Sequence, residues 1–307
     1  MDVEGQPPDR IGLIAGYGKF PILFAKNAKT NGVRVVGFGI RHEASPELEE
    51  HVERLHWVGV AKVGRLIRLL KSEGIRRAVM AGKVRKTVMF APFRILRLLP
   101  DLRTFRLWFR RVRDKRDDTL LGAVAEELAS EGIRLESSLL YCKDLLAAEG
   151  LLAGKPPAER EAADIRFGWK LAKAMGGLDV GQSVSVKEQA VLAVEAIEGT
   201  DQAILRAGSL GRGGFVVVKV SKPGQDPRFD VPAIGPDTIR TMASAGGKVL
   251  AVEAGATLVL GVEETLSLAE KEGITVVGLR NPAEGAEIAI PGVSASQNGR
   301  KAKEPLA

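Results

Sequence analysis

The sequence predicts an α/β protein of two domains, an N-terminal Rossmann-like domain with a parallel sheet and a C-terminal α/β domain with a mixed sheet. Short apolar runs alternate with helical patterns over residues 11–82, as in parallel sheets with right-handed crossovers. The chain has 307 residues, which is too long for one small core. Composition shifts over residues 144–163, which include "GKPP", and strand patterns of another kind follow.

The N-terminal domain is predicted over residues 1–143. The run "IGLIA" ends at a glycine and is typical of a short buried strand. The pattern "KVGRLIRLLKSEG" is amphipathic and ends at Gly74, as helices often do. The same criteria predict strands at 11–15, 33–40, 54–60, 75–82 and 133–141, and helices at 20–32, 62–74 and 117–132.

Residues 144–163 are predicted to be a linker, 164–285 the C-terminal domain, and 286–307 a polar, disordered tail. The alternation in "QSVSVKEQAVLAVEAIEG" favours a pair of strands joined as a hairpin. Further strands are predicted at 215–220, 248–254, 256–261 and 274–279, and helices at 164–178, 200–208, 237–246 and 262–273.

Composition limits the setting of the protein. No apolar run approaches the roughly 20 residues that span a bilayer, and the opening "MDVEGQPPDR" is not a signal peptide. A cytoplasmic protein is therefore expected. The single cysteine, Cys142, excludes an internal disulfide and a cysteine-built metal site, and is expected to be a buried, inert thiol.

The net charge of +7 is concentrated in one segment, Lys83–Arg116. Its basic residues alternate with leucines and aromatics, among them Phe90, Phe93, Phe105, Trp108 and Phe109. This mixture suits the surface of an anionic membrane or acyl chains, and equally a helix with one core face and one solvated basic face. Nucleic acid is a third reading, which the composition favours less.

Two glycine turns follow predicted strands. In "AGYGKFP", Gly16, Gly18 and Lys19 open a helix, where backbone N–H groups could contact a phosphate. Gly82 and Lys83 repeat the pattern after a later strand. A tight turn explains a lone Gly-x-Gly equally well, although its place at a strand end favours a phosphate contact. The dinucleotide fingerprint is incomplete, which argues against nicotinamide binding.

The stretch "SKPGQDPRFDVPAIGPDT" is too rich in proline and charge to be a helix or strand interior. Within it Lys222 and Arg228 could neutralise phosphate, while Asp226 and Asp230 could bind a cation or orient water. The alternative is an ordinary surface turn that carries charged side chains without a functional role. The histidines show no metal-ligand spacing, so an enzyme of this sequence would work with carboxylates and a hard metal.

Several motifs together resemble the LpxI-type UDP-2,3-diacylglucosamine pyrophosphatases of lipid A biosynthesis. The matching pieces run in family order over about residues 11–280, and they include "GLIAGYGKFP", "AVMAGKVRK", "DDTLLGAVAEELASEGI", "GLDVGQSVSVKEQAVLAVEAIEGTD" and "KPGQDPRFDVPAIGPDTI". The first ten residues, the tail and the long basic–aromatic segment lie outside the pattern.

The resemblance implies hydrolysis of UDP-2,3-diacylglucosamine to 2,3-diacylglucosamine 1-phosphate (lipid X) and UMP, with Mg²⁺ or alternatively Mn²⁺. It implies a catalytic role for Asp230, with Asp226 ranked second. Asp230 and Asp201, the latter a carboxylate at a helix start in "EGTD", are the expected metal ligands. Substrate contacts are expected from Gly16, Gly18, Lys19, Gly82, Lys83, Gln182, Thr200, Lys222, Gln225 and Arg228.

The expected location is the cytoplasm, peripheral to the inner membrane, without a nucleic-acid partner; a homo-oligomer is left open. A non-hydrolytic protein that binds a nucleotide sugar or an anionic lipid is the alternative function. Release of UMP from the lipid substrate would distinguish the two.

Overall fold

A computed structural model describes residues 9–84, 99–111, 117–226, 228, 231–283 and 286–293, without the side chains of 108–111 and 117–119. Several predictions fall elsewhere: Asp230, residues 85–98 and 112–116 of the basic–aromatic segment, the side chains of Trp108 and Phe109, and the tail beyond residue 293 lie outside the described residues. The chain forms two compact units, Met1–Leu145 with Pro223–Val231, and Leu146–Lys222 with Pro232–Ala307.

The N-terminal unit is built on a parallel five-stranded sheet of order β3-β2-β1-β4-β5. Strand order reverses beside β1, where β2 lies on one side and β4 on the other. Its strands are β1 (Arg10–Ala15), β2 (Arg34–Ile40), β3 (Arg54–Val58), β4 (Arg77–Ala81) and β5 (Arg134–Glu136). Its helices are α1 (Phe20–Thr30), η1 (Pro46–His51), α2 (Val63–Ser72), α4 (Leu102–Arg111), α5 (Asp117–Ser130) and η3 (Lys143–Leu145).

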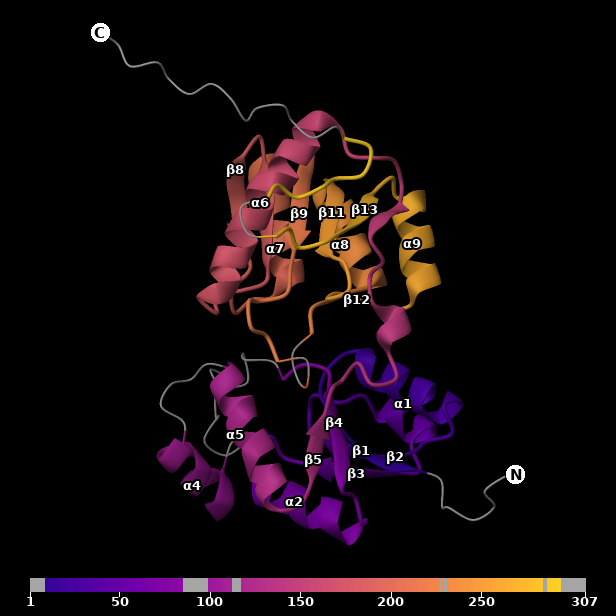
Figure 1. The fold of residues 1–307 in the computed structure, drawn as a ribbon, viewed down its shortest axis with the longest axis vertical. Helices are drawn as coiled ribbons and strands as arrows, with labels where there is room; N and C mark the ends of the chain where they lie inside the picture. The colour runs from indigo at the N-terminus through magenta and orange to yellow at the C-terminus, as the bar shows by residue number, and fades with distance from the viewer. Residues whose placement is uncertain are drawn as a thin grey trace. The chain divides into compact units, whose positions relative to one another are not determined.

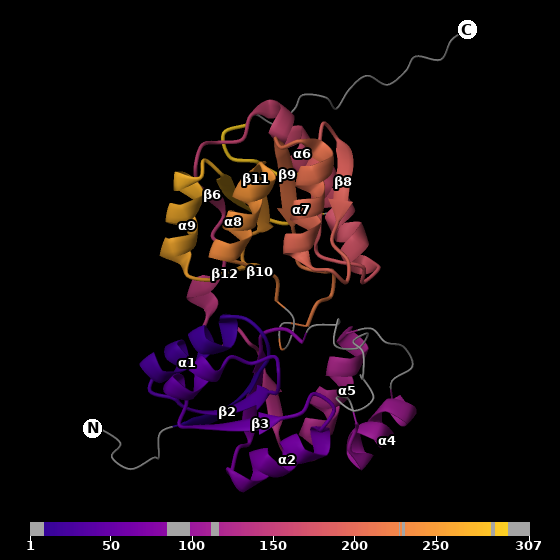
Figure 2. The same ribbon diagram turned by 180° about the vertical axis from the view of Figure 1, so that it is seen from behind.

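Helices cover both faces of this sheet (Figures 1 and 2). α2 and α5 bury their apolar stripes in one cluster with strand residues such as Phe38, while α1 packs on β1, β2 and β4 from the other side. Burial on both faces explains why β1 and β2 read as continuous apolar runs rather than as alternating ones.

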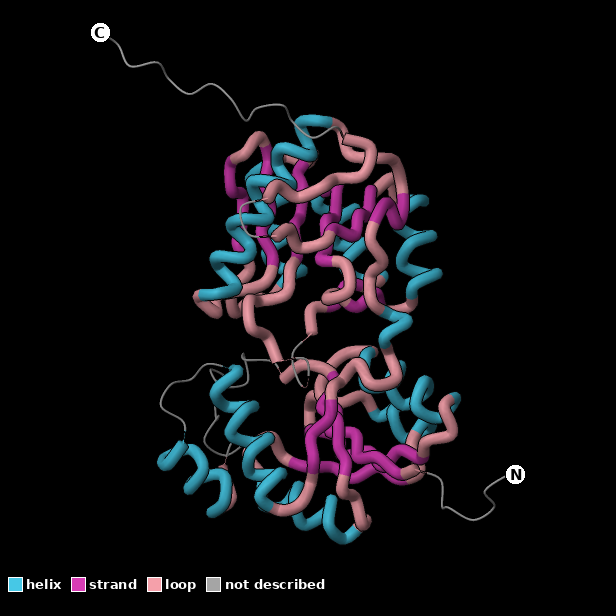
Figure 3. The backbone as a smooth tube through the Cα atoms, in the orientation of Figure 1, coloured by secondary structure: helices cyan, strands magenta, loops and turns pink. Residues whose placement is uncertain are grey.

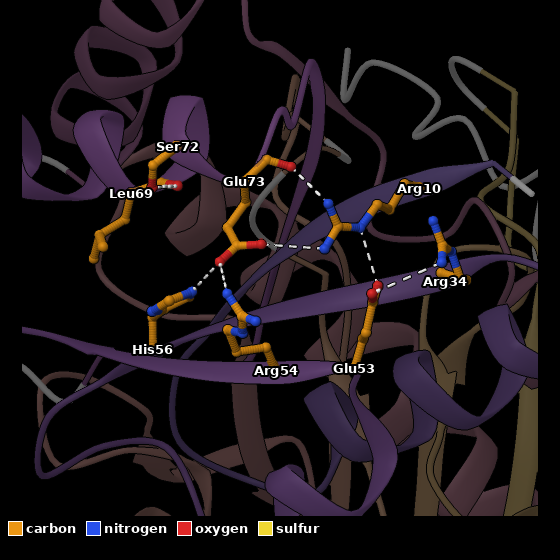
Figure 4. A network of polar contacts seen from close by, with 8 residues as sticks. All are labelled: Arg10, Arg34, Glu53, Arg54, His56, Leu69, Ser72 and Glu73. Atoms are coloured by element: carbon orange, nitrogen blue, oxygen red, sulfur yellow. Dashed lines mark hydrogen bonds and ion pairs between the residues drawn. The ribbon is translucent and has the colours of Figure 1, made fainter. Parts of the chain in front are cut away.

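The amino ends of these strands carry an ionic network around Glu73 (Figure 4). The side chain of Glu73 is 8% exposed, and its carboxylate lies 2.8 Å from His56 Nε2, 2.9 Å from Arg54 Nη1 and 3.1 Å from Arg10 Nη2. The hydrogen bond with His56 lowers the pKa of Glu73 most, burial opposes it, and the bonds from Arg54 and Arg10 lower it further. The network ties the end of α2 to β1 and β3, opposite the carboxyl ends where the glycine turns lie.

The C-terminal unit has a six-stranded mixed sheet of order β6-β13-β11-β9-β7-β8, and β10 pairs with β12 beside it. β13, β11 and β9 are parallel, while β6, β7 and β8 run antiparallel to their neighbours. The strands are β6 (Gly150–Ala153), β7 (Ser183–Lys187), β8 (Ala190–Val194), β9 (Phe215–Lys219), β10 (Ala233–Ile234), β11 (Gly247–Glu253), β12 (Leu258–Val259) and β13 (Thr275–Leu279). The helices are α6 (Glu159–Gly177), α7 (Thr200–Gly211), α8 (Pro236–Ala245) and α9 (Val262–Lys271).

This sheet also forms the middle layer of its unit, with the strands in magenta between cyan helices in Figure 3. α6 packs on one face, where Trp169 and Ile165 meet Val218 and neighbouring strand residues. α7, α8 and α9 contribute to a second cluster on the other face. Gly168 permits the close approach of α6, because a Cβ there would lie 2.9 Å from Val218 Cγ2.

The predicted fold class is confirmed, with an all-parallel N-terminal sheet and a mixed C-terminal one. The sequence patterns did not predict α4, η1, β6 or β10. β6 and the start of α6 fall within residues 144–163, the predicted linker. Cys142 is buried, and burial together with the charge of Asp144 raises the pKa of its thiol to about 12. Within the described ranges, every helix is too short or too polar to cross a bilayer.

Candidate active site

The charged loop, Val220 to Pro232, begins after β9 of the six-stranded sheet and ends at β10, which pairs with β12 outside that sheet. Within the loop, Asp226 and Arg228 form a two-pronged ion pair. Arg228 Nη2 lies 2.6 Å from Asp226 Oδ2, and Arg228 Nε lies 3.0 Å from Oδ1 and 2.9 Å from Oδ2. The backbone N–H of Arg228 also donates to Oδ1 at 3.0 Å. The guanidinium lowers the pKa of Asp226, and the carboxylate raises the pKa of Arg228.

The loop is entered through residues that are fixed by buried charges. Glu253, at the end of β11, accepts the backbone N–H of Ser221 at 2.7 Å. Its carboxylate also pairs with Lys173 of α6 at 2.6 and 2.8 Å, and Lys173 donates in turn to the Ser221 carbonyl at 3.0 Å. The backbone of Ser221 is therefore held from both its donor and its acceptor side.

Lys222, predicted to contact phosphate, lies in an ion pair at the same entry. Its Nζ is 2.6 Å from Oδ1 of Asp179, which follows the C-terminus of α6. Both side chains are largely buried, at 8% and 14% exposure. Lys222 therefore already has a carboxylate partner in this structure.

A second buried polar cluster surrounds Lys219, the last residue of β9. Lys219 Nζ donates to Thr200 Oγ1 at 2.9 Å and to the Ala233 carbonyl at 2.8 Å. Thr200 donates to Glu195 Oε1 at 2.9 Å, and Ser183 donates to Glu195 Oε2 at 2.7 Å. An ammonium can only donate, so the hydroxyl of Thr200 accepts from Lys219 and gives its one hydrogen to Glu195. Thr200, another predicted substrate contact, thus links a buried cation to a buried carboxylate.

The two predicted phosphate turns of the N-terminal unit bond to one another. Tyr17 N–H donates to the Lys83 carbonyl at 2.7 Å, Lys83 N–H donates to the Tyr17 carbonyl at 3.0 Å, and Gly16 N–H donates to the Ala81 carbonyl at 2.8 Å. A Cβ on Gly16 would lie 2.6 Å from the Lys83 oxygen, and one on Gly82 would lie 2.7 Å from the Tyr17 oxygen. Both glycines are therefore needed for this crossing of two backbones, whatever ligand binds nearby.

The turns nevertheless occupy the place where open α/β sheets bind ligands. They lie at the carboxyl ends of β1 and β4, where the strand order reverses. Tyr17, Gly18, Lys19 and Lys83 are exposed there. The phosphate contact predicted at these residues stays a prediction.

The remaining predicted residues come from three different segments of the chain. Gln182 contributes its carbonyl, which accepts the Val220 N–H at 2.9 Å, and Gln225 lies within the loop. Asp201 is exposed in the first turn of α7. Among the described residues, no three or more His, Cys, Asp or Glu side chains converge as a metal site would require. Because Asp230 is outside the described residues, the pairing of Asp230 with Asp201 on a metal stays a prediction.

Five functional candidates were absent from the sequence-based prediction: Lys173, Asp179, Glu195, Lys219 and Glu253. Lys219 and Glu253 could have been found, because each is a charge near the end of an otherwise apolar run, "FVVVKV" and "VLAVEA". A charge that follows a buried strand without a break needs a partner. The partner residues lie far away in the sequence and carry no local signal.

Comparison with known proteins identifies relatives of both units. The model of the LpxI N-terminal domain matches residues 10–145, and that of the LpxI C-terminal domain matches residues 148–277. A curated relative, the UDP-2,3-diacylglucosamine pyrophosphatase LpxI of Caulobacter vibrioides, is 32% identical over 280 residues, which cover 88% of this chain and 97% of the relative.

Two solved structures that match the chain are much less similar in sequence. The UDP-glucose 4-epimerase of Thermus thermophilus in complex with NAD covers 92% of this chain and 90% of its own, with 11% identity and a TM-score of 0.30. The biotin carboxylase domain of Hydrogenobacter thermophilus 2-oxoglutarate carboxylase covers 67% of this chain and 42% of its own, with 10% identity and a TM-score of 0.26. Scores this low support no statement about ligands.

Proposed function

The chain belongs to the LpxI family, and we propose from this that it is a UDP-2,3-diacylglucosamine diphosphatase that releases lipid X and UMP. In this hydrolysis, water adds across the phosphoric anhydride. Its oxygen joins one phosphorus, and the bridging oxygen leaves with the other phosphate. The observation that carries the proposal is the relative of the same named activity, which is matched over 97% of its length, through both domains.

Asp230 is the proposed catalytic carboxylate. An aspartate can both hold a metal ion and take a proton from the attacking water. Asp226, the second candidate, is committed: Arg228 holds both of its oxygens and lowers its pKa, which makes it a poorer base. Arg228 keeps its cation beside the same loop, where it can stabilise charge on phosphate oxygens.

Magnesium, or manganese in its place, is the proposed cofactor, and Asp230 and Asp201 are its proposed ligands. A bound divalent ion would neutralise charge that develops on the phosphate oxygens and lower the pKa of water. Asp201 suits the role of ligand because its carboxylate is exposed in the first turn of α7.

The substrate's phosphates are proposed to contact the glycine turns and the charged loop. Lys19 and Lys83 are exposed at the carboxyl edge of the N-terminal sheet, and Gln225 and Arg228 lie in the loop. Lys222, Thr200 and Gln182 are the remaining proposed substrate contacts.

The acyl chains and the inner-membrane surface are proposed to meet the Lys83–Arg116 segment, on the cytoplasmic side. In its described part, α4 buries Thr104 and Leu107 and exposes Phe105 at 49% and Leu102 at 77%. A helix with exposed apolar side chains among arginines suits a headgroup boundary.

The proposal is tested by incubating the purified protein with UDP-2,3-diacylglucosamine and separating the products. Stoichiometric UMP and lipid X are expected, with activity lost in chelator and regained with Mg²⁺ or Mn²⁺. Binding of the substrate without UMP release would instead favour a nucleotide-sugar or lipid-binding protein. Full activity after exhaustive chelation would refute the proposed role of the metal but would leave the proposed reaction intact.

A further inference from the structure

The two ends of the charged loop are tied by lysine side chains that the family comparison does not point to. The loop runs from Val220 to Pro232 and carries the proposed catalytic aspartate. Lys219 stands immediately before it, and Ala233 immediately after it. The bond from Lys219 Nζ to the Ala233 carbonyl, 2.8 Å long, therefore closes the base of the loop between two residues 14 positions apart.

Burial makes this closure specific. Lys219 is 3% exposed, and a buried ammonium without acceptors is strongly unfavourable. Its acceptors include the Thr200 hydroxyl and the Ala233 carbonyl. Thr200 is the first residue of α7. Its hydroxyl donates to Glu195, whose negative charge balances the ammonium of Lys219. If the loop's return strand shifted away, the ammonium would lose one of these acceptors.

Lys173 holds the entry of the loop in the same manner. Its Nζ lies 3.0 Å from the Ser221 carbonyl and is oriented by both oxygens of Glu253. Glu253 also accepts the Ser221 N–H, so the entry peptide is bonded on both sides. Lys173 comes from α6 and Glu253 from β11, and these elements form the core of the C-terminal unit.

We propose that Lys173 and Lys219 are positioning residues that clamp the entry and the return of the charged loop. They touch no reacting atom in this assignment; they hold the backbone of Ser221 and Ala233, at the two ends of the loop whose sequence contains Asp226, Arg228 and Asp230. The inference deepens the proposed function and rests on it for the kinetic effect only, because the clamp itself can be measured without substrate.

Trypsin measures the clamp directly. The loop offers it one susceptible bond, Arg228–Phe229, since the proline after Lys222 blocks cleavage there. Lys219→Met and Lys173→Met keep the apolar stem and remove the ammonium. We expect each to raise the rate of nicking at Arg228 about tenfold under native conditions, because cleavage follows the population of the opened loop. Lys248→Met, at the one exposed position of neighbouring β11, is the matched control and is expected to leave the rate unchanged.

The kinetic arm uses UDP-2,3-diacylglucosamine with the same variants. A displaced loop is expected to lower kcat by about 10- to 100-fold while KM stays within about twofold, because groups that act in the transition state are misplaced. If the replaced lysine contributed only to overall stability, its variant would have a lower melting temperature and would be cleaved at many sites. Such a variant would retain its kcat at low temperature.

Each outcome decides one part of the inference. Wild-type nicking rates in both variants would overturn the clamp. Faster nicking with unchanged kcat would overturn the positioning role. If Lys219→Met fails to fold, Lys173→Met alone decides, since its side chain is 20% exposed and its loss is better tolerated. Absence of UMP release by the wild type would refute the proposed function, and the nicking result would still decide the clamp.

Discussion

At the scale of single residues, the ion pair of Asp226 bears on which aspartate of the charged loop acts on the substrate. Asp226 shares its charge with Arg228 through both oxygens, and its pKa is lowered as a result. Removal of a carboxylate that is already paired with a protein cation should lower the reaction rate little. Removal of a carboxylate that takes a proton from the attacking water should lower the rate greatly.

We therefore predict that Asp230→Asn lowers kcat by about 10²- to 10⁴-fold, the range that general-base catalysis contributes. Asp226→Asn is predicted to cost less than about tenfold, since its partner keeps the charge that phosphate needs. Initial rates of UMP release measure both effects, and melting temperatures check that both variants are folded. The opposite ranking would show that the acting aspartate is Asp226.

Glu73 gives a second prediction at this scale, which concerns stability. Its folded-state pKa lies below the ordinary value of 4.5, so its ionised form stabilises the fold above that pH. This contribution is lost as the pH falls through the lower, folded pKa. Glu73→Gln resembles the protonated side chain, and we predict that it lowers the free energy of unfolding by about 2 kcal/mol at pH 7.

The difference between wild type and Glu73→Gln is predicted to shrink below pH 4.5 and to vanish once the wild-type carboxyl is protonated. Urea unfolding at several pH values measures it. A difference that is constant with pH would mean that the substitution acts through packing and not through charge.

Residue roles were the part of the site that sequence alone predicted least. Gly16 and Gly82 were predicted to contact phosphate, and the close approach that the structure shows at each is between two turns of the chain itself. Lys222 was predicted to contact phosphate and Thr200 to contact the substrate, and each has a buried protein partner that lies in another element. Such pairings depend on tertiary structure, and no local pattern encodes them.

At the scale of elements, the hairpin between β7 and β8 shows how a turn can be fixed from outside. Its two central residues, Glu188 and Gln189, both have positive φ, at 53° and 56°. This pair is typical of a type I′ turn, which usually carries Asn and Gly. Here Asp164 of α6 accepts both turn N–H groups, at 3.0 and 2.6 Å, and so offsets the strain.

We predict that Gln189→Gly raises the free energy of unfolding by about 1 kcal/mol, because glycine adopts this conformation without a Cβ clash. Ala190→Gly, one residue later and within β8, is the control, and is predicted to lower stability by about 0.5–1 kcal/mol. Denaturant midpoints of the two variants are compared with that of the wild type. A destabilised Gln189→Gly would show that the glutamine side chain contributes more than its strain costs.

The elements themselves were largely predictable. Long periodic segments such as α2 and fully apolar strands such as β9 carry strong local signals. β6 and β10 have four and two residues, and they are strands only because a neighbouring strand pairs with them. α4 was not predicted, because the charged and aromatic residues of its segment were compatible with several structures.

At the scale of the whole molecule, two features favour binding to an anionic membrane: the net charge of +7 and the exposed apolar side chains on α4. Not every cation there is available, because Arg103 is paired with Glu127 and Glu131. Membrane attraction would therefore combine a general electrostatic term, which salt screens, with a local apolar term, which salt does not weaken.

We predict that the protein floats with anionic vesicles at low salt and less so as salt increases. Leu102→Ser with Phe105→Ser is predicted to weaken binding about tenfold or more at every salt concentration, since two apolar side chains no longer enter the headgroup boundary. Leu210→Ser, on α7 and 62% exposed, is the control and is expected to bind normally. If the wild type never floats, the segment has a structural role.

Cys142 makes the chain a convenient starting point for spectroscopy. It is the single cysteine, it is buried, and the pKa of its thiol is about 12. Maleimides react with the thiolate, so the wild type is expected to stay unlabelled at neutral pH while folded. A surface cysteine introduced in each unit would then take a donor and an acceptor dye without removal of the native residue. Energy transfer between the dyes would follow the distance between the two units, with substrate and without it.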